Sequence, residues 1–198
     1  MTSRTTAIAA ALSLLPLGQP LLLGSTTTLA TAAVVLSTQA AHAQSAEDYL
    51  NRGNAKYRLR DYQGAIADYS KALEINPQFA FAYTNRGSAK GDLGDYQGAI
   101  VDYNKAIELD PQYANAYSNR GNVKGKSGEY QAAIADYNKA IEINPQYANA
   151  YANRSIAKEK QGDLQGSCSD AKKAVSLGHQ STAQWLNSAD GAWCRNMR

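Results

Sequence analysis

From residue 46 onward, apolar residues recur at the spacing of one helix face. The clearest stripe follows Asp61 at positions three or four residues apart, namely Tyr62, Ala65, Ile66, Tyr69, Ala72 and Leu73. A shorter stretch before it carries Tyr49 and Gly53 four residues apart, with Ala55 close behind. Because an α-helix repeats about every 3.6 residues, both stretches predict amphipathic helices that bury one face. Residues 46–79 are therefore expected to form a pair of helices.

The same pattern returns every 34 residues. Ala-Tyr-Thr-Asn-Arg-Gly at 82–87 becomes Ala-Tyr-Ser-Asn-Arg-Gly at 116–121. Asp-Tyr-Gln-Gly-Ala-Ile at 61–66 returns unchanged at 95–100. Self-similarity at such a fixed period is the signature of a repeat architecture. The sequence thus divides into three full units and a degenerate fourth, at 46–79, 80–113, 114–147 and 148–179.

Each unit also carries signals for the ends of its helices. A glycine, which favours the left-handed conformation, stands where the first helix of later units should end, at Gly94, Gly128 and Gly162. The next residue, Asp95, Glu129 or Asp163, is expected to stand at the start of the second helix. Aspartate is a good cap at that place. A proline closes each unit and is expected to stop one helix and to open the next as its first residue, at Pro77, Pro111 and Pro145. Every unit is thus predicted to be a helix-turn-helix.

Small residues are expected where the two helices of a unit approach each other. First helices carry a glycine at Gly53, Gly87 and Gly121, and these are predicted to face the second-helix alanines Ala65, Ala99 and Ala133. A larger side chain at either place would force the helices apart. Together with the tyrosines and prolines, this spacing resembles the tetratricopeptide repeat, a helix-turn-helix unit of 34 residues.

The resemblance covers residues 46–147 almost completely and 148–179 in part. It implies an all-α fold, an α-solenoid of helix-turn-helix repeats in which residues 180–198 form a capping helix and tail. Each repeat would gain a core by stacking on its neighbours, and a terminal repeat should look atypical. The phrase that begins Asp-Tyr-Gln-Gly also looks like arrays common in photosynthetic bacteria.

One position departs from the usual pattern of this repeat. Where leucine is common before the glycine, this chain has an arginine, at Arg52, Arg86, Arg120 and Arg154. An aspartate follows sixteen residues later in every unit, at Asp68, Asp102, Asp136 and Asp170. A bidentate ion pair between the two helices would stabilise each hairpin, less the cost of desolvating both charges. The alternative is that both side chains are exposed and independent.

The C-terminal end changes character. Ser155 replaces the repeat glycine, and residues 181–188, which include Trp185, are expected to form a short helix over the last hydrophobic edge. Cys168 stands where earlier units carry isoleucine, and Cys194 lies in the tail. In an oxidising compartment these two cysteines are expected to form a disulfide. The alternative is two buried or free thiols.

Residues 1–43 differ in composition from the rest of the chain. They hold one basic residue, Arg4, and no acidic residue, and no apolar run reaches the roughly 18 residues of a membrane span. Ala41-His42-Ala43 is a small-x-small pattern that suits a signal peptidase. We expect a signal peptide at 1–43, a bacterial exported protein in the periplasm, a lumen or the outside medium, and no membrane insertion after cleavage. An uncleaved anchor is the alternative.

Charge and residue usage argue against several function classes. Lysine and arginine total 20 against 17 aspartates and glutamates, without the basic stripe that a nucleic-acid partner requires. His179, the only histidine after residue 43, is expected at a helix end or on the surface, and two cysteines do not supply a four-ligand zinc site. The glycines follow the repeat period and form no phosphate loop. We expect no enzyme activity, no metal and no cofactor.

The resemblance also implies which residues face a ligand, namely the second, fifth, sixth, ninth, twelfth and thirteenth of each unit. The groove residues expected from this rule are Asn51, Asn54, Tyr57, Phe81, Thr84, Asn85, Ser88, Asn115, Asn119, Asn122, Asn149 and Asn153. An asparagine amide donates and accepts at once, which suits an extended peptide backbone. Some members clamp a peptide's C-terminal carboxylate, but the matching positions here carry none of the three cations of that clamp, being Leu50, Asn54, Asn85, Asn115 and Asn119.

The sequence therefore predicts a non-catalytic scaffold that binds a protein or an extended peptide outside the cytoplasm, with the assembly of an envelope or membrane complex as one setting. The alternative is a structural module that associates with itself into a homo-oligomer, because the first unit has no cap over its exposed edge.

Overall fold

The computed structural model describes residues 45–196, and the predicted signal peptide at 1–43 lies outside the described residues. The described part is built from helices with no strand among them. In chain order they are α3 (Ala46–Arg58), α4 (Tyr62–Ile75), α5 (Ala80–Asp92), α6 (Tyr96–Leu109), α7 (Ala114–Lys126), α8 (Tyr130–Ile143), α9 (Ala148–Lys160), α10 (Leu164–Ser176), α11 (Gln180–Asn187) and α12 (Ala192–Asn196). Among residues 45–196, no helix has both the length and the hydrophobicity needed to cross a membrane.

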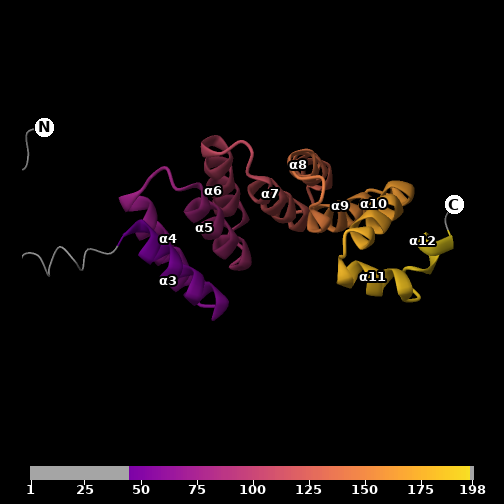
Figure 1. Ribbon diagram of the computed structural model, residues 1–198, viewed down its shortest axis with the longest axis horizontal. Coiled ribbons are helices and arrows are strands. Elements are labelled where there is room, and N and C mark those ends of the chain that lie inside the picture. Colours follow the sequence, from indigo (N-terminus) through magenta and orange to yellow (C-terminus); the bar gives the residue numbers. More distant parts are fainter. Residues whose placement is uncertain (1–44, 197–198) are drawn as a thin grey trace, which may run out of the picture. The chain divides into compact units, whose positions relative to one another are not determined.

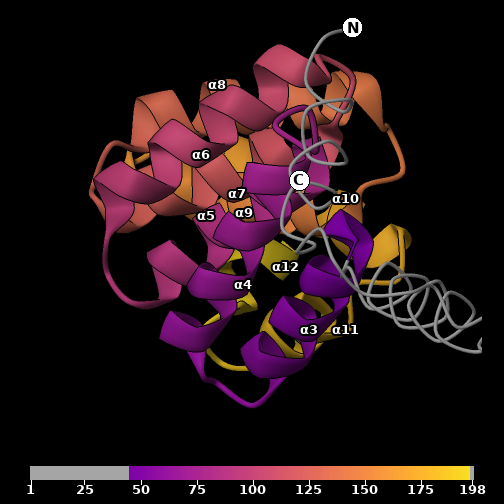
Figure 2. The same ribbon diagram turned by 90° about the vertical axis from the view of Figure 1, so that its left-hand side faces the viewer.

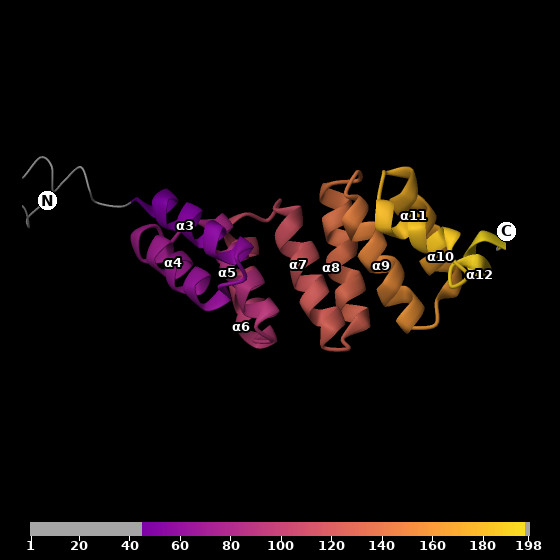
Figure 3. The ribbon, with the colours of Figure 1, turned by 90° about the horizontal axis from the view of Figure 1, so that it is seen from below.

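The helices pack in consecutive pairs. Within a pair, α3 lies against α4, α5 against α6, α7 against α8 and α9 against α10, and each pair stacks on the next through its second helix (Figures 1 and 3). The first helices also touch one another, α3 with α5, α5 with α7 and α7 with α9. Figure 2 views this stack from its α3–α4 end. The predicted all-α solenoid with a C-terminal capping helix is confirmed.

The predicted helix boundaries have clear physical causes. Gly94, Gly128 and Gly162 have φ of +86°, +83° and +85°, as expected for the left-handed residue after a first helix. The first pair uses Arg60 there instead, at φ +62°.

At the start of a second helix, a capping aspartate occurs together with a glycine three residues later. The Asp61 side chain accepts from the Gly64 backbone N–H at 2.9 Å, and a Cβ at Gly64 would lie 2.1 Å from that carboxylate. Asp95 with Gly98 and Asp163 with Gly166 repeat this arrangement. Glu129 makes no such cap, and the glycine three residues later is replaced by Ala132. Glycine therefore stands at this place where a capping aspartate lies over it.

The role predicted for the prolines is wrong in one respect. Each proline ends a helix pair, but it lies in the turn and the next helix begins three residues after it, as with Pro77 and Ala80. The residue before the proline fixes that turn, because the Asn76 side chain accepts from the backbone N–H of Gln78 at 3.0 Å. Asp110 and Asn144 form the same turn.

The glycines of the first helices lie closest to a tyrosine ring, and a Cβ at Gly87 would also lie 3.1 Å from the carbonyl oxygen of its predicted alanine, Ala99. A Cβ at Gly53 would lie 2.6 Å from the ring of Tyr69, and one at Gly121 would lie 2.8 Å from Tyr137. At Gly87 the nearest atom is again a tyrosine ring carbon, in Tyr103 at 2.9 Å. The alanines predicted to face these glycines are fully buried beside the tyrosines. A buried tyrosine ring against a glycine is therefore the contact that sets the helix spacing in each full repeat.

The predicted arginine–aspartate pairs are confirmed in all four helix pairs. Arg86 donates to both carboxylate oxygens of Asp102, at 2.9 and 2.7 Å, and the aspartate side chain is only 2% exposed. The same bidentate pair joins Arg52 to Asp68, Arg120 to Asp136, and Arg154 to Asp170. Such planar two-point pairs are the strongest geometry for this interaction.

A lysine completes each of these pairs and escaped sequence reasoning. Lys90 lies one helical turn after Arg86, and its ammonium nitrogen is 2.8 Å from the same Asp102 carboxylate. Lys56, Lys124 and Lys158 do the same in the other pairs. Each buried aspartate is thus held by two cations. Substitution of Lys90 would therefore disturb the same ion pair as substitution of Arg86.

The arginines also join neighbouring pairs. The second terminal nitrogen of Arg120 donates to the Asn104 side chain of the preceding pair at 2.6 Å, and Arg154 reaches Asn138 in the same way. Arg86 donates to the Ser70 hydroxyl at 3.1 Å. One guanidinium therefore links three helices, which explains why arginine replaces the usual leucine.

The C-terminal cap contains one helix more than the sequence indicated. The expected cap is α11, and its N-terminus is capped by His179, whose Nδ1 accepts from the Thr182 backbone N–H at 3.2 Å. The segment expected to be a tail contains α12, where Cys194 is joined to Cys168 of α10 by a disulfide. Both cysteines are buried. The disulfide thus ties α12 to the last helix pair.

Candidate partner-binding groove

Four pockets follow the first helices from α3 to the cap. We call the surface of α3, α5, α7 and α9 that carries them the first-helix wall. The pocket between α3 and α5 has a volume of 190 Å³ and the next, reaching α7, one of 140 Å³. The pocket between α7 and α9 has 460 Å³, and the one between α9 and α11 has 510 Å³. The two pockets at the C-terminal end are therefore larger than the two before them.

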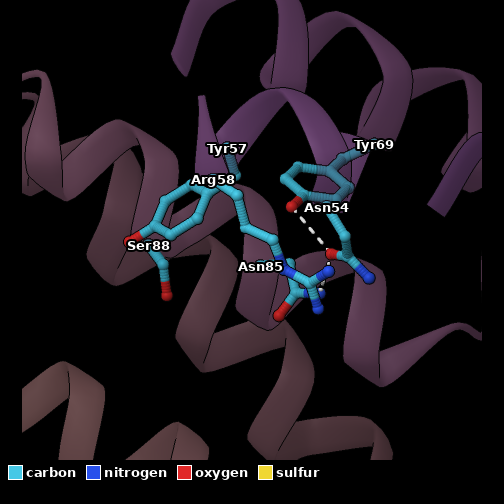
Figure 4. A pocket seen from close by; sticks show the side chains of 6 residues that line it. All are labelled: Asn54, Tyr57, Arg58, Tyr69, Asn85 and Ser88. Atoms are coloured by element: carbon cyan, nitrogen blue, oxygen red, sulfur yellow. Dashed lines mark hydrogen bonds between the residues drawn. The ribbon is translucent and has the colours of Figure 1, made fainter. Parts of the chain in front are cut away.

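Asn54 organises the first of these pockets. Its side-chain oxygen accepts from the Tyr69 hydroxyl and from the Asn85 amide nitrogen, both at 2.9 Å (Figure 4). Tyr69 comes from the second helix of the same pair, whereas Asn85 comes from the first helix of the next. Burial raises the pKa of the Tyr69 hydroxyl to about 12, so it stays a donor at neutral pH. The amide is thus a bridge between repeats as well as part of the pocket surface.

This bridge recurs along the wall. Asn122 accepts from Tyr137 and from Asn153 of the following pair, each at 2.8 Å. In the middle of the wall Ser88 takes the place of the accepting asparagine, with the Asn119 amide nitrogen at 3.4 Å and the Tyr103 hydroxyl oxygen at 3.2 Å. The predicted asparagine ladder therefore uses at least one N–H of each later rung to hold neighbouring repeats together.

The middle of the wall carries a polar contact that the sequence did not reveal. The Tyr57 hydroxyl donates to the Asp92 carboxylate at 2.5 Å, and Lys126 approaches the other oxygen of Asp92 at 3.9 Å. Burial of the phenol, and then the hydrogen bond to Asp92, raise the pKa of Tyr57 well above its ordinary value. Asp92 and Lys126 occupy the thirteenth place of successive repeats, so their charges oppose each other across the wall.

Seven of the predicted groove residues line these pockets, namely Asn54, Tyr57, Asn85, Ser88, Asn119, Asn122 and Asn153. Four others are exposed but do not line these four pockets, namely Asn51, Phe81, Asn115 and Asn149. The expectation for Thr84 is wrong. Its side chain is buried, with 2% of the residue exposed, and its hydroxyl donates to the Ala80 carbonyl of its own helix. Thr84 and Ser118, the fifth-place residues of the second and third repeats, are both buried and closed to a ligand.

Sequence reasoning missed the apolar residues of the C-terminal pockets. Ile156 lines both of the larger pockets and is 56% exposed. Tyr130 lines one of them, and Trp185 lines the other beside His179. A signal was present in the sequence, because Ile156 occupies the ninth place, where the full repeats carry asparagine or serine.

Within residues 45–196, no group of three or more histidines, cysteines, aspartates or glutamates is placed to hold a metal ion. Nδ1 of His179 is occupied as a helix cap, with the Thr182 hydroxyl 2.7 Å away. The wall instead offers amides, phenols and a few charges at a row of open pockets. Such a surface is suited to binding.

This arrangement, paired helices whose first members line a row of pockets, defines a helical-repeat protein. Residues 46–79 and 114–147 match the family model described as the tetratricopeptide repeat, and residues 91–128 match a second one described as the TPR repeat. The chain therefore contains tetratricopeptide repeats. No curated protein sequence matches the chain.

Solved structures of several repeat proteins are similar to this chain. A crystal structure of MamA has a TM-score of 0.64 and 28% sequence identity, over 74% of this chain and 86% of that one. The first TPR of Spaghetti (RPAP3), bound to the HSP90 peptide SRMEEVD, has a TM-score of 0.58 and 28% identity, over 60% and 94%. The Arabidopsis OM64 TPR domain has a TM-score of 0.57 and 29% identity, over 58% and 95%.

Proposed function

We propose that this protein is a non-catalytic scaffold that binds an extended segment of a partner protein along the first-helix wall. The observation that carries the proposal is the row of four pockets that runs from α3 to α11. A row of this kind offers successive side chains of one extended peptide successive places to bind. The amide and phenol groups between the pockets supply hydrogen-bond partners for its backbone.

The solved relatives support peptide binding as the class of function. The Spaghetti (RPAP3) repeat domain holds a peptide, and the matching part of this chain has the same fold. The acidic C-terminal tail of that peptide is not the ligand we propose here. The clamp positions lack cations, and two of them, Asn54 and Asn85, are hydrogen-bonded to each other.

We place the scaffold outside the cytoplasm, in the assembly of an envelope or membrane complex. The signal-like composition of residues 1–43 supports this placement, and a Cys168–Cys194 disulfide would persist in such an oxidising compartment. The test is mass spectrometry of the mature protein from cell fractions. A chain that begins at Gln44 in an exported fraction is expected, and a full-length chain confined to the cytoplasm would refute the placement.

A plug on the wall tests the binding proposal and replaces no residue of the asparagine bridges. A Cβ at Gly125, which lines the pocket between α7 and α9, would meet only the Ala133 methyl and the Tyr137 hydroxyl, both at 3.9 Å. Gly125→Leu should therefore fold normally and fill part of the pocket. Ala135→Leu, at an exposed place on α8, is the matched control.

The assay is binding of each purified variant to an array of blocked octapeptides of varied sequence. We expect the parent protein and Ala135→Leu to bind the same subset of peptides, and Gly125→Leu to lose about tenfold or more in affinity for them, the cost of displacing one buried side chain. The proposal fails if the parent binds no peptide above background, or if Gly125→Leu binds as the parent does.

A further inference from the structure

The two C-terminal pockets of the first-helix wall differ from the rest in size and in chemistry. Their volumes are 460 and 510 Å³, against 190 and 140 Å³ for the two pockets before them. Asn153 and Ile156 line both large pockets, so the two adjoin one another. We call these two pockets together the C-terminal subsite.

Ile156 gives this subsite an apolar centre. In the repeats before it, the ninth place is polar and accepts a hydrogen bond from the next asparagine, as Asn122 does from Asn153. In the described part of the chain, α10 is followed by α11, and no asparagine is seen to reach the ninth place of the fourth repeat. The isoleucine found there is 56% exposed, between Tyr130 on one side and Trp185 on the other. A large apolar side chain set between two open pockets is a typical anchor for a binding partner.

The charges around the subsite are arranged on one side. Lys126 and Lys160 both line the pocket between α7 and α9, and both are exposed. Lys126 approaches Asp92 only at 3.9 Å. The neighbouring pocket between α9 and α11 contains Glu159 instead. The two lysines therefore line the pocket that holds Tyr130, next to the exposed isoleucine.

We propose that the C-terminal subsite binds an internal partner segment in which a large aliphatic or aromatic residue is adjacent to acidic residues. This inference rests on the proposed function and specifies the partner. The apolar side chain packs on Ile156, and the neighbouring carboxylates lie near Lys126 and Lys160. Apolar burial supplies affinity, and the lysines select sequence and raise the association rate.

The test is fluorescence anisotropy with labelled seven-residue peptides, blocked at both ends so that no terminal charge contributes. One probe has a central leucine followed by two glutamates. A second probe replaces the leucine by serine, and a third replaces the glutamates by glutamines. We expect the first probe to bind about tenfold or more tightly than the second, the value for burial of one leucine side chain. We expect it to bind severalfold more tightly than the third, with a preference that weakens as salt is added.

Two variants locate the binding. Ile156→Asn restores the residue type that Asn122 shows to be compatible with this place, and because Ile156 is exposed, the fold should be unaffected. It should weaken the leucine probe about tenfold and leave the serine probe unchanged. Lys126→Gln with Lys160→Gln should remove the preference for glutamate and leave that for leucine. Lys139→Gln, at a partly exposed lysine on α8 that pairs with Glu142, is the control for loss of a lysine outside the subsite and should change neither.

Several outcomes would overturn the inference. It fails if Ile156→Asn binds the leucine probe as the parent does, or if the glutamine probe binds as well as the glutamate probe at low salt. It also fails if sedimentation shows a dimer that Ile156→Asn dissociates, which would assign the surface to a second copy of this chain. If the octapeptide array yields ligands but none is apolar and acidic, the inference fails and the proposed function stands. If the array yields no ligand at all, both fail.

Discussion

Adding a single methyl group to α7 should have opposite effects at two glycines one helical turn apart. Gly121 lies against the ring of Tyr137, where a Cβ would be 2.8 Å from the nearest ring carbon. Gly125 lies where a Cβ would be 3.9 Å from its nearest neighbours, an ordinary contact. We expect Gly121→Ala to destabilise the protein and Gly125→Ala to stabilise it.

The magnitude follows from two opposing effects. Replacing glycine by alanine inside a helix gains about 0.5–1 kcal/mol, because alanine loses less backbone entropy on folding. At Gly121 the ring of Tyr137 must move by about 0.7 Å to restore a normal carbon–carbon distance. That ring is buried, with 3% of the residue exposed, and its hydroxyl is hydrogen-bonded to Asn122. Overpacking of this kind costs about 1–3 kcal/mol, which leaves a net loss of about 1–2 kcal/mol.

The assay is thermal unfolding followed by circular dichroism. For a chain of this size 1 kcal/mol corresponds to about 2–4 °C in Tm. Gly121→Ala should therefore lower Tm by about 2–8 °C, and Gly125→Ala should raise it by about 1–4 °C. In a Tyr137→Leu background, which removes the obstructing ring, the cost of Gly121→Ala should largely disappear.

The reasoning is refuted if Gly121→Ala melts at or above the temperature of the parent. It is equally refuted if the two alanine variants shift Tm by the same amount, or if the cost at Gly121 is unchanged in the Tyr137→Leu background. Any of these three results would mean that the tyrosine–glycine contact does not set the helix spacing.

Three further perturbations test other parts of the structure. Asp136→Asn should lower the free energy of unfolding in urea by about 2–4 kcal/mol, because it removes a buried charge held by two cations. Glu142→Gln, in an exposed pair, should lower it by less than about 0.5 kcal/mol. Equal losses would contradict a stabilising role for the buried aspartate and its two cations. Burial raises the pKa of Tyr69 and Tyr103 from 10.0 to about 12, so the stability that the two buried phenols contribute is complete below pH 10 and is lost as pH rises toward 12. Tyrosinate absorbance that showed every tyrosine of the folded chain ionising near pH 10 would exclude the raised pKa values. Reduction of the Cys168–Cys194 disulfide should lower the free energy of unfolding by about 3 kcal/mol, the value expected from chain entropy, and should increase hydrogen exchange in α12. Unchanged exchange would show that the disulfide does not hold α12 on α10.

The sequence allowed the fold to be predicted because the signals within one repeat are local and recur. The glycine after the first helices of the later repeats, the capping aspartates and the small residue at Gly121 occur at fixed spacings, and so does the sixteen-residue interval from Arg86 to Asp102. A local signal that appears three or four times is much more specific than one that appears once. The arginine–aspartate pair could be predicted because both partners belong to the same hairpin.

Contacts between repeats were harder to predict, because they depend on how one hairpin lies on the next. The bridge from Asn85 to Asn54 spans 31 residues, and the Tyr69 hydroxyl that donates to the same Asn54 oxygen must be placed as well. The burial of Thr84 was likewise not predicted from its place within one repeat. The short helix α12 has five residues, too few to show a periodic pattern. Ile156 was overlooked because one exposed apolar residue carries no meaning until the pockets beside it are known.

The central claim, that the first-helix wall holds an extended peptide, can be tested most directly by photo-crosslinking. The probe is the blocked leucine–glutamate peptide with the leucine replaced by its photoreactive diazirine analogue, and the crosslinked residues are located by mass spectrometry. The account predicts adducts on α9 and α11, around Ile156 and Trp185, that excess unlabelled peptide removes. Adducts on the second helices α4, α6 and α10, or adducts that excess peptide does not remove, would contradict it.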